Sequence, residues 1–143
     1  MRRVSALAIL AIAAFGTSSA LAGTSDYAGT VKGGGSIQLR FKKSGGARKI
    51  TRFDFQHVPI RCDGKRRAAT GNLNFTRPVK HGHFTIRGKN EKDGVIRVNG
   101  DVKSRGRKVT GTIRLDGAIH VDGITGYAHK CHSGVDDWTA RRG

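Results

Sequence analysis

Apolar and polar residues alternate with a period of two along most of the chain. Ile37, Leu39 and Phe41 are separated by polar residues, and Phe53 and Phe55 repeat the pattern. This period is typical of strands with one buried face, and no apolar pattern at helical spacing is sustained. The pattern therefore predicts a chain built from β-strands.

Further stretches show the same alternation, with apolar positions at Val58, Ile60 and Cys62, at Leu73 and Phe75, at Phe84 and Ile86, at Ile96, Val98 and Val102, and at Val109, Ile113 and Leu115. The stretch from Val58 alternates in the opposite phase to Phe53 and Phe55. That change predicts a bulge or a strand break near Gln56 and His57. Gly100 and Gly111 fall inside strand patterns, where a missing side chain is typical of a bulge or a close backbone approach.

Glycine clusters with Ser, Asp, Asn and Lys between the apolar stretches, and such clusters form turns. These turns fall at residues 33–35, 44–46, 63–64, 81–82, 89–94, 104–106, 116–117 and 122–123. About eight short strands at spacings near ten residues favour an antiparallel fold over alternating strands and helices. We therefore predict an all-β antiparallel β-sandwich, with a β-barrel as the alternative.

The first 22 residues have the three parts of a signal peptide: Arg2 and Arg3, an apolar run from residue 4 to 15, and the small-x-small site at 20–22. The apolar run of about a dozen residues is shorter than the roughly 20 needed to span a bilayer. We expect cleavage before Gly23 and a single secreted domain over residues 23–143. This domain would be extracellular or associated with the cell wall, without stable membrane insertion after cleavage.

The chain has two cysteines, Cys62 and Cys131. Because an exported chain matures in an oxidising compartment, an even cysteine count predicts a disulfide. The bridge would close a loop of about 70 residues and contribute roughly 4 kcal/mol to stability. A free reactive thiol and a thiolate metal ligand are the alternatives, and the predicted compartment favours neither.

Three segments carry a resemblance: residues 58–64 (VPIRCDG), residues 84–88 (FTIRG) and the closing Trp138-Thr139-Ala140. Together they resemble small exported proteins of high-GC Gram-positive bacteria. The resemblance implies a single β-sandwich domain with one disulfide over about residues 27–142, and it implies no particular activity. We also expect Trp138, the only tryptophan, to be buried against the core near the bridge.

The formal net charge is +17, from 27 lysines and arginines against ten acidic residues, and only Arg2 and Arg3 fall in the leader. Such an excess favours anionic partners, although the alternative is that the charge only maintains solubility. If consecutive strands are antiparallel with short links, successive turns alternate between the two ends of the fold. Ten cations in three turns would then share one end without an acid: Lys42, Lys43, Arg48, Lys49, Arg77, Lys80, Lys103, Arg105, Arg107 and Lys108.

The opposite end would be nearly balanced in charge. Its turns hold four acidic residues and five cations: Asp63, Glu91, Asp93 and Asp116 with Lys65, Arg66, Arg67, Lys89 and Lys92. Asp136 and Asp137 would face opposite ways on a strand and are expected to counter the nearby Arg141 and Arg142.

Residues that would indicate catalysis or a metal are scattered. No nucleophile elbow, phosphate loop or zinc-protease motif is present. The six histidines (His57, His81, His83, His120, His129 and His132) have no ligand spacing that stands out, although His81 and His83 would share a strand face. We therefore expect no metal and no other cofactor.

These observations predict a secreted, non-catalytic binding module for anionic polymers of the cell envelope or surroundings. The partner classes are teichoic-type polymers, acidic polysaccharide and extracellular nucleic acid. One alternative is a structural or partner-binding envelope protein whose charge is incidental. An enzyme of unknown class is the other.

Overall fold

The computed structural model describes residues 22–143. They form nine strands: β1 (Ala22–Val31), β2 (Ser36–Ser44), β3 (Ala47–Cys62), β4 (Lys65–Pro78), β5 (His83–Lys89), β6 (Val95–Lys103), β7 (Lys108–His120), β8 (Tyr127–His132) and β9 (Asp136–Arg142). A short 3-10 turn, η2 (Ser104–Gly106), precedes β7. The predicted signal peptide lies outside the described residues except for its last position, Ala22, which begins β1.

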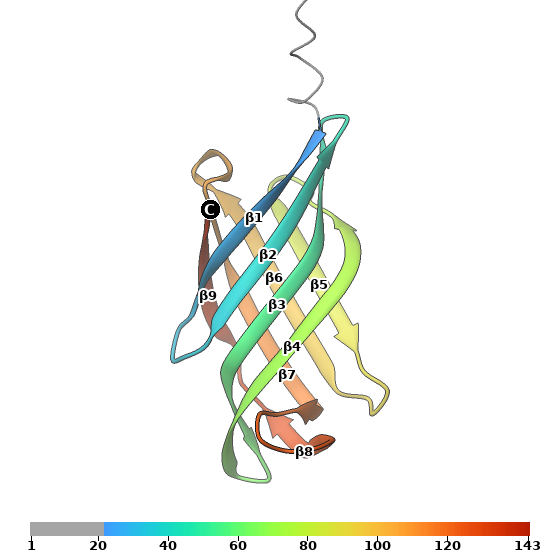
Figure 1. The fold of residues 1–143 in the computed structure, drawn as a ribbon, viewed down its shortest axis with the longest axis vertical. Helices are drawn as coiled ribbons and strands as arrows, with labels where there is room; N and C mark the ends of the chain where they lie inside the picture. Colours follow the sequence, from blue (N-terminus) through green and yellow to red (C-terminus); the bar gives the residue numbers. More distant parts are fainter. Residues whose placement is uncertain (1–21) are drawn as a thin grey trace, which may run out of the picture.

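The strands form one antiparallel sheet in the order β4-β3-β2-β1-β9-β7-β6-β5, and β8 pairs with both β3 and β7. Strands β1 to β4 lie in front of β5, β6, β7 and β9, so the sheet curves into two layers (Figure 1). Because β8 bridges the two layers, they are parts of one ring-like sheet. The predicted antiparallel all-β fold with one disulfide is confirmed.

Alternating burial along the strands confirms the period-two pattern. In β2, Ile37, Leu39 and Phe41 are buried and the residues between them are exposed. The predicted irregularity in β3 is also present, since its register with β4 shifts between Phe55 and Val58. The extra length of chain at this bulge returns apolar side chains to the core after the change of phase.

Aromatic rings fill the centre of the core around Trp138, which is 2% exposed. Its ring lies 5.7 Å from that of Phe53 and 6.5 Å from that of Phe84, measured between centroids. Gly111 lies opposite Trp138, and a Cβ atom there would meet the indole ring. The close approach predicted at this glycine is therefore confirmed.

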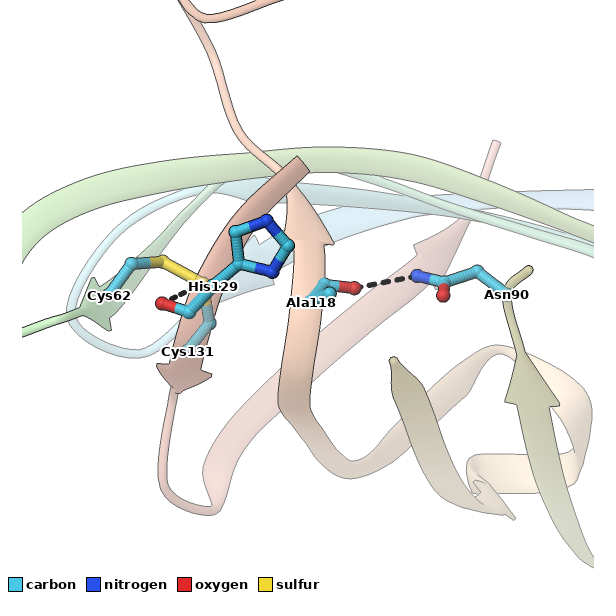
Figure 2. Close-up of a disulfide and its surroundings, with 5 residues drawn as sticks. All are labelled: Cys62, Asn90, Ala118, His129 and Cys131. Atoms are coloured by element: carbon cyan, nitrogen blue, oxygen red, sulfur yellow. Dashed lines mark hydrogen bonds between the residues drawn. A yellow bond between two sulfur atoms is a disulfide. The ribbon is translucent and has the colours of Figure 1, made fainter. Parts of the chain in front are cut away.

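Trp138 is buried as expected, but its expected position near the bridge is wrong. It pairs with Gly111 of β7, whereas Cys131 pairs with Gly117, six residues farther along the same strand. The bridge joins Cys131 of β8 to Cys62 of β3 (Figure 2). Strand β8 lies at the lower end of the molecule in Figure 1. Both half-cystines are buried. They form one of the two residue pairs that join β3 to β8, and the other pair is Arg61 with His132.

Residues 22–143 contain no helix with the length and hydrophobicity that a membrane crossing requires.

Candidate functional site

Three turns of the chain meet at one end of the molecule: those between β2 and β3, between β4 and β5, and between β6 and β7 (Figure 1). Backbone hydrogen bonds join the β4–β5 turn to strands β3 and β6 beside it. The amide of Val79 donates to the carbonyl of Arg48 over 2.9 Å, and the amide of Val102 donates to the carbonyl of Gly82 over 2.7 Å. The structure therefore brings together segments far apart in sequence.

This end carries all ten cations that the turn pattern grouped. We call them the cationic crown: Lys42, Lys43, Arg48, Lys49, Arg77, Lys80, Lys103, Arg105, Arg107 and Lys108. Eight of these residues are exposed, and Arg48 and Lys108 are half-buried. An approaching partner would therefore meet ammonium and guanidinium groups across several neighbouring strands.

Within the crown, cations lie directly opposite cations on paired strands. The opposed pairs are Lys42 with Lys49, Lys43 with Arg48, and Lys103 with Lys108. Residues directly opposite in an antiparallel pair have Cβ atoms about 4.5–5.5 Å apart, and like charges in such positions are destabilising. The sheet register thus holds positive charges close together at this end.

No crown residue forms an ion pair with a carboxylate among residues 22–143. The acids nearest to the crown in the strands are bound by other partners. Asp26 accepts a hydrogen bond from the Arg40 guanidinium over 2.8 Å, which lowers the pKa of this carboxyl group. Asp101 is paired with His83 at 2.8 Å. The crown cations are therefore left without neutralising side chains.

The turn that presents Arg105 is held rigidly against β1 and β3. Ser104 and Arg105 have left-handed backbone conformations, with φ of 50° and 57°. The Tyr27 hydroxyl donates to the carbonyl of Gly106 from within the core. Gly106 has a φ of 84°, a conformation that favours glycine, and the guanidinium of Arg48 lies 3.2 Å from where a Cβ atom of this residue would be. This packing fixes one crown turn against another.

Two further cations reach the crown that the turn pattern did not include. Arg141 of β9 lies opposite Lys108, and the amide of Arg142 donates to the carbonyl of Arg107 over 2.9 Å. The expectation that Asp136 and Asp137 counter these arginines is wrong, because Asp136 pairs with Ile113 at the other end of β9. The pairing of β9 with β7 determines this placement, and no local signal in the sequence predicts it.

The opposite end, which we call the disulfide end, pairs three of its acids with cations. The ion pairs are Lys89 with Asp93 at 3.1 Å, Arg114 with Asp116 at 2.7 Å and Lys130 with Asp63 at 3.9 Å. The side chain of Asn90 also ties the β5–β6 turn to β7, since its amide donates to the carbonyl of Ala118 over 2.8 Å (Figure 2). Charge and hydrogen bonding are thus better matched here than at the crown.

Three of the histidines have separate partners. The Nδ1 atom of His57 lies 2.5 Å from a carboxylate oxygen of Asp122. The pKa of the Asp122 carboxyl is lowered mainly by a hydrogen bond from Thr70 and, to a smaller extent, by the one from His57. His83 is bound to Asp101, and the ring of His120 stacks on Tyr127 with centroids 4.0 Å apart. Within residues 22–143 no three His, Cys, Asp or Glu side chains are grouped as metal ligands.

The chain matches no protein-family model, no curated protein and no solved structure. The resemblance to exported proteins of high-GC Gram-positive bacteria stays a prediction. The function proposed below therefore rests on the geometry and charge of the crown.

Proposed function

We propose that the protein is a secreted, non-catalytic binding module that holds anionic polymers against the cationic crown. The observation that carries the proposal is the set of directly opposed cation pairs at one end of the sheet, none of them neutralised by a described carboxylate. A fold that keeps like charges in register loses stability by doing so. An anionic partner would offset that loss when it binds.

A polymer fits this surface better than a small anion does. Neighbouring strands lie about 4.8 Å apart, so cations on several strands meet a series of negative groups rather than a single one. Each neutralised phosphate or carboxylate releases condensed counterions, which favours binding at low salt. The aromatic side chains that stack on bases in nucleic-acid sites are mostly buried here, with Phe41, Phe53, Phe55 and Phe84 in the core.

The preferred partners are therefore polymers that present repeated charge: teichoic-type polymers, acidic polysaccharide or extracellular nucleic acid. The disulfide and the predicted signal peptide support an extracellular location, where such polymers occur. The protein would recognise them by charge density and spacing, with little selectivity for a chemical sequence.

The experiment compares two variants that lose the same charge. In the crown variant, four cations of the β2–β3 hairpin are replaced by Gln: Lys42, Lys43, Arg48 and Lys49. In the control variant, four exposed cations outside the crown are replaced by Gln: Lys65, Arg87, Lys92 and Arg97. None of these eight residues belongs to an ion pair with a described side chain, so neither variant releases an acid.

Binding to duplex DNA and to a poly(glycerol phosphate) chain is measured at several salt concentrations. On duplex DNA, log K falls with log salt with a slope of about −0.9 per neutralised phosphate. We expect the crown variant to lose affinity and to flatten this slope by up to about 3.6, the contribution of four contacts. The control variant should retain most of the parental slope.

Equal losses in the two variants would mean that the charge acts diffusely, and the crown would lose its role. An absence of polyanion affinity in the parent protein at low salt would refute the proposal. The structural or partner-binding role would then take its place. Thermal melts and tryptophan fluorescence of both variants establish that each remains folded.

A further inference from the structure

A second cationic feature lies at the disulfide end, outside the crown. It is an open groove of about 640 Å³ between the β1–β2 turn, the β3–β4 hairpin and the link from β8 to β9. Four of its lining residues are basic: Arg61, Arg66, Arg67 and His132. No carboxylate is among the described residues that line it. We call it the arginine groove.

Strand register places three of these residues in one row. Arg61 of β3 lies directly opposite Arg66 of β4 on one side and directly opposite His132 of β8 on the other. Cross-strand partners project from the same face of a sheet, and all three residues are exposed. Two guanidinium groups and an imidazole therefore stand side by side over neighbouring strands.

The disulfide holds this row in place. β3 and β8 share only two residue pairs, Arg61 with His132 and Cys62 with Cys131. The covalent bond between the two cysteines therefore fixes the relative position of the basic residues beside them. A site whose groups are already in place loses less conformational entropy when a ligand binds.

The acids around the row are bound elsewhere. Asp116 lies opposite His132 on the far side of β8, and its carboxylate accepts a hydrogen bond from Arg114 over 2.7 Å. Asp63, in the turn of the β3–β4 hairpin, is paired with Lys130. The Arg61 guanidinium donates one hydrogen bond to the carbonyl of Gly64 over 3.3 Å, which leaves most of its N–H groups free for a ligand.

We propose that the arginine groove is a discrete binding site for a phosphate group. Arginine presents a planar fork that donates two parallel hydrogen bonds to an oxyanion. A carboxylate has two oxygens, which one fork can occupy, whereas a phosphate group has enough oxygens to accept from both arginines and from His132. The directly opposed guanidinium groups therefore match a tetrahedral oxyanion better than a carboxylate.

The test uses a variant pair with matched charge and matched strand geometry. The groove variant carries Arg61→Gln and Arg66→Gln. The control variant carries Arg87→Gln and Arg97→Gln, which removes another directly opposed and exposed arginine pair, located on β5 and β6 outside the groove. Both variants lose two charges and a directly opposed arginine pair. Arg97 also lies opposite Arg114, so the control removes at least as much repulsion between cations as the groove variant does.

Inorganic pyrophosphate is titrated into each protein by calorimetry in low-salt buffer, and the site is mapped by amide chemical shifts. We expect saturable binding of one equivalent, with the largest shifts at Arg61, Arg66 and His132. Affinity should fall at least about tenfold in the groove variant, as when a charge-assisted hydrogen bond is lost, and change less than about twofold in the control. Non-saturable binding, or equal losses in the two variants, would overturn the proposal.

A phosphate group can belong to a free oligophosphate or to a phosphodiester polymer. A second titration with glycerophosphoglycerol, a soluble phosphodiester, distinguishes the two sources. Stronger binding of pyrophosphate would assign the groove to free phosphates. Binding of the diester with comparable affinity would assign it to a polymer. Failure of both ligands to bind would refute the site.

The groove and the crown are tested independently of each other. The four-residue crown variant should keep its pyrophosphate affinity within about twofold, because its substitutions lie at the opposite end of the sheet. If the crown variant lost pyrophosphate binding while the groove variant kept it, the groove would be excluded. Loss of polymer binding in the crown variant alone would leave the groove proposal intact.

Discussion

The two ends of this sheet differ in how many of their charged turn residues are neutralised by ion pairs. At the crown end, Lys43 lies opposite Arg48, and no described acid neutralises either residue. At the disulfide end, acids pair with cations, as in the ion pair of Lys89 with Asp93, and a covalent bond joins two strands. The bridge and these ion pairs therefore lie at the end away from the crown, and the opposed Arg61 and Arg66 of the arginine groove share that end with them.

Repulsion between the opposed crown cations lowers the stability of the fold, and contacts elsewhere in the molecule offset that loss. Small domains are stable by only about 5–15 kcal/mol, so several opposed cation pairs use a measurable part of that margin. A disulfide of this loop length contributes roughly 4 kcal/mol, enough to offset them. The comparison predicts that stability and polyanion binding respond differently to changes at each end.

The largest effect is expected at neither end but in the central core. Trp138→Ala should lower the free energy of unfolding by roughly 3–5 kcal/mol, because a large buried ring is lost. The indole nitrogen has no hydrogen-bond partner among the described side chains, so no bond is sacrificed with it. Urea unfolding measures the change.

The salt dependence of the same variant tests whether the core and the crown are coupled. Since Trp138 is uncharged and buried, the salt dependence of stability should match that of the parent protein. A neutral effect on stability would contradict the observed burial of the ring. A changed salt dependence would mean that the core and the crown are coupled.

Removal of the bridge comes next and acts on one end. Cys62→Ser with Cys131→Ser should cost roughly 4 kcal/mol, the loop-closure contribution of a link across about 70 residues. Hydrogen exchange should accelerate most in β8 and in the tip of the β3–β4 hairpin, because β8 contacts β3 through only two residue pairs. Alkylation of the unreduced parent protein should label no thiol.

The crown turns provide the control for the bridge variant. Hydrogen exchange at their amides should accelerate no more than the drop in the global free energy of unfolding accounts for. Uniform acceleration at both ends would show that the disulfide stabilises the whole sheet and not mainly one end. Two alkylated thiols in the unreduced parent would contradict the bridge itself.

Local patterns in the sequence predict much of this fold. The alternation at Ile37, Leu39 and Phe41 predicts a half-buried strand, and the change of phase before Val58 predicts the bulge that the structure contains. Turn residues group the crown cations because short links between consecutive antiparallel strands alternate between the two ends of the fold. These features depend on residues close together in the chain, so a single sequence carries them.

Long-range pairing is what the sequence leaves undetermined. The placement of β9 between β1 and β7 brings Arg141 to Lys108, and only tertiary contacts determine it. The arginine groove is an intermediate case. A hairpin around residues 63–64 places Arg61 near Arg66, and an antiparallel pairing of Cys62 with Cys131 places His132 opposite Arg61. The sequence contains both signals, but the second requires the strand register.

A smaller effect is expected when one opposed cation pair becomes an ion pair. Lys43→Glu places a carboxylate opposite Arg48 and should raise the free energy of unfolding by about 0.2–1 kcal/mol. The same substitution should weaken polyanion binding, because it removes one positive charge from the crown and adds a negative one. Thermal melts and DNA binding at low salt measure the two effects.

The matched control for this substitution is Lys92→Glu at the disulfide end. It makes the same change in charge, but beside Glu91 and Asp93, where repulsion between acids should lower stability slightly. Opposite signs at the two ends would support the charge asymmetry between them. A loss of stability in both variants would mean that the opposed crown cations are not repelling one another.

The smallest effect is expected at the start of β9, where two acids, Asp136 and Asp137, are adjacent in the chain. Burial raises the pKa of the Asp136 carboxyl, and the neighbouring Asp137 raises it further. A carboxyl with a raised pKa in the folded state contributes stability that is complete below its unfolded pKa and is lost as pH rises through the folded value. Asp136→Asn should therefore have a higher free energy of unfolding than the parent at pH 7. The gain should be smaller than the gain from Lys43→Glu, and it should disappear near pH 3. Urea midpoints at the two pH values decide it, and an Asn variant that is less stable at pH 7 would show that the Asp136 carboxylate makes a favourable contact.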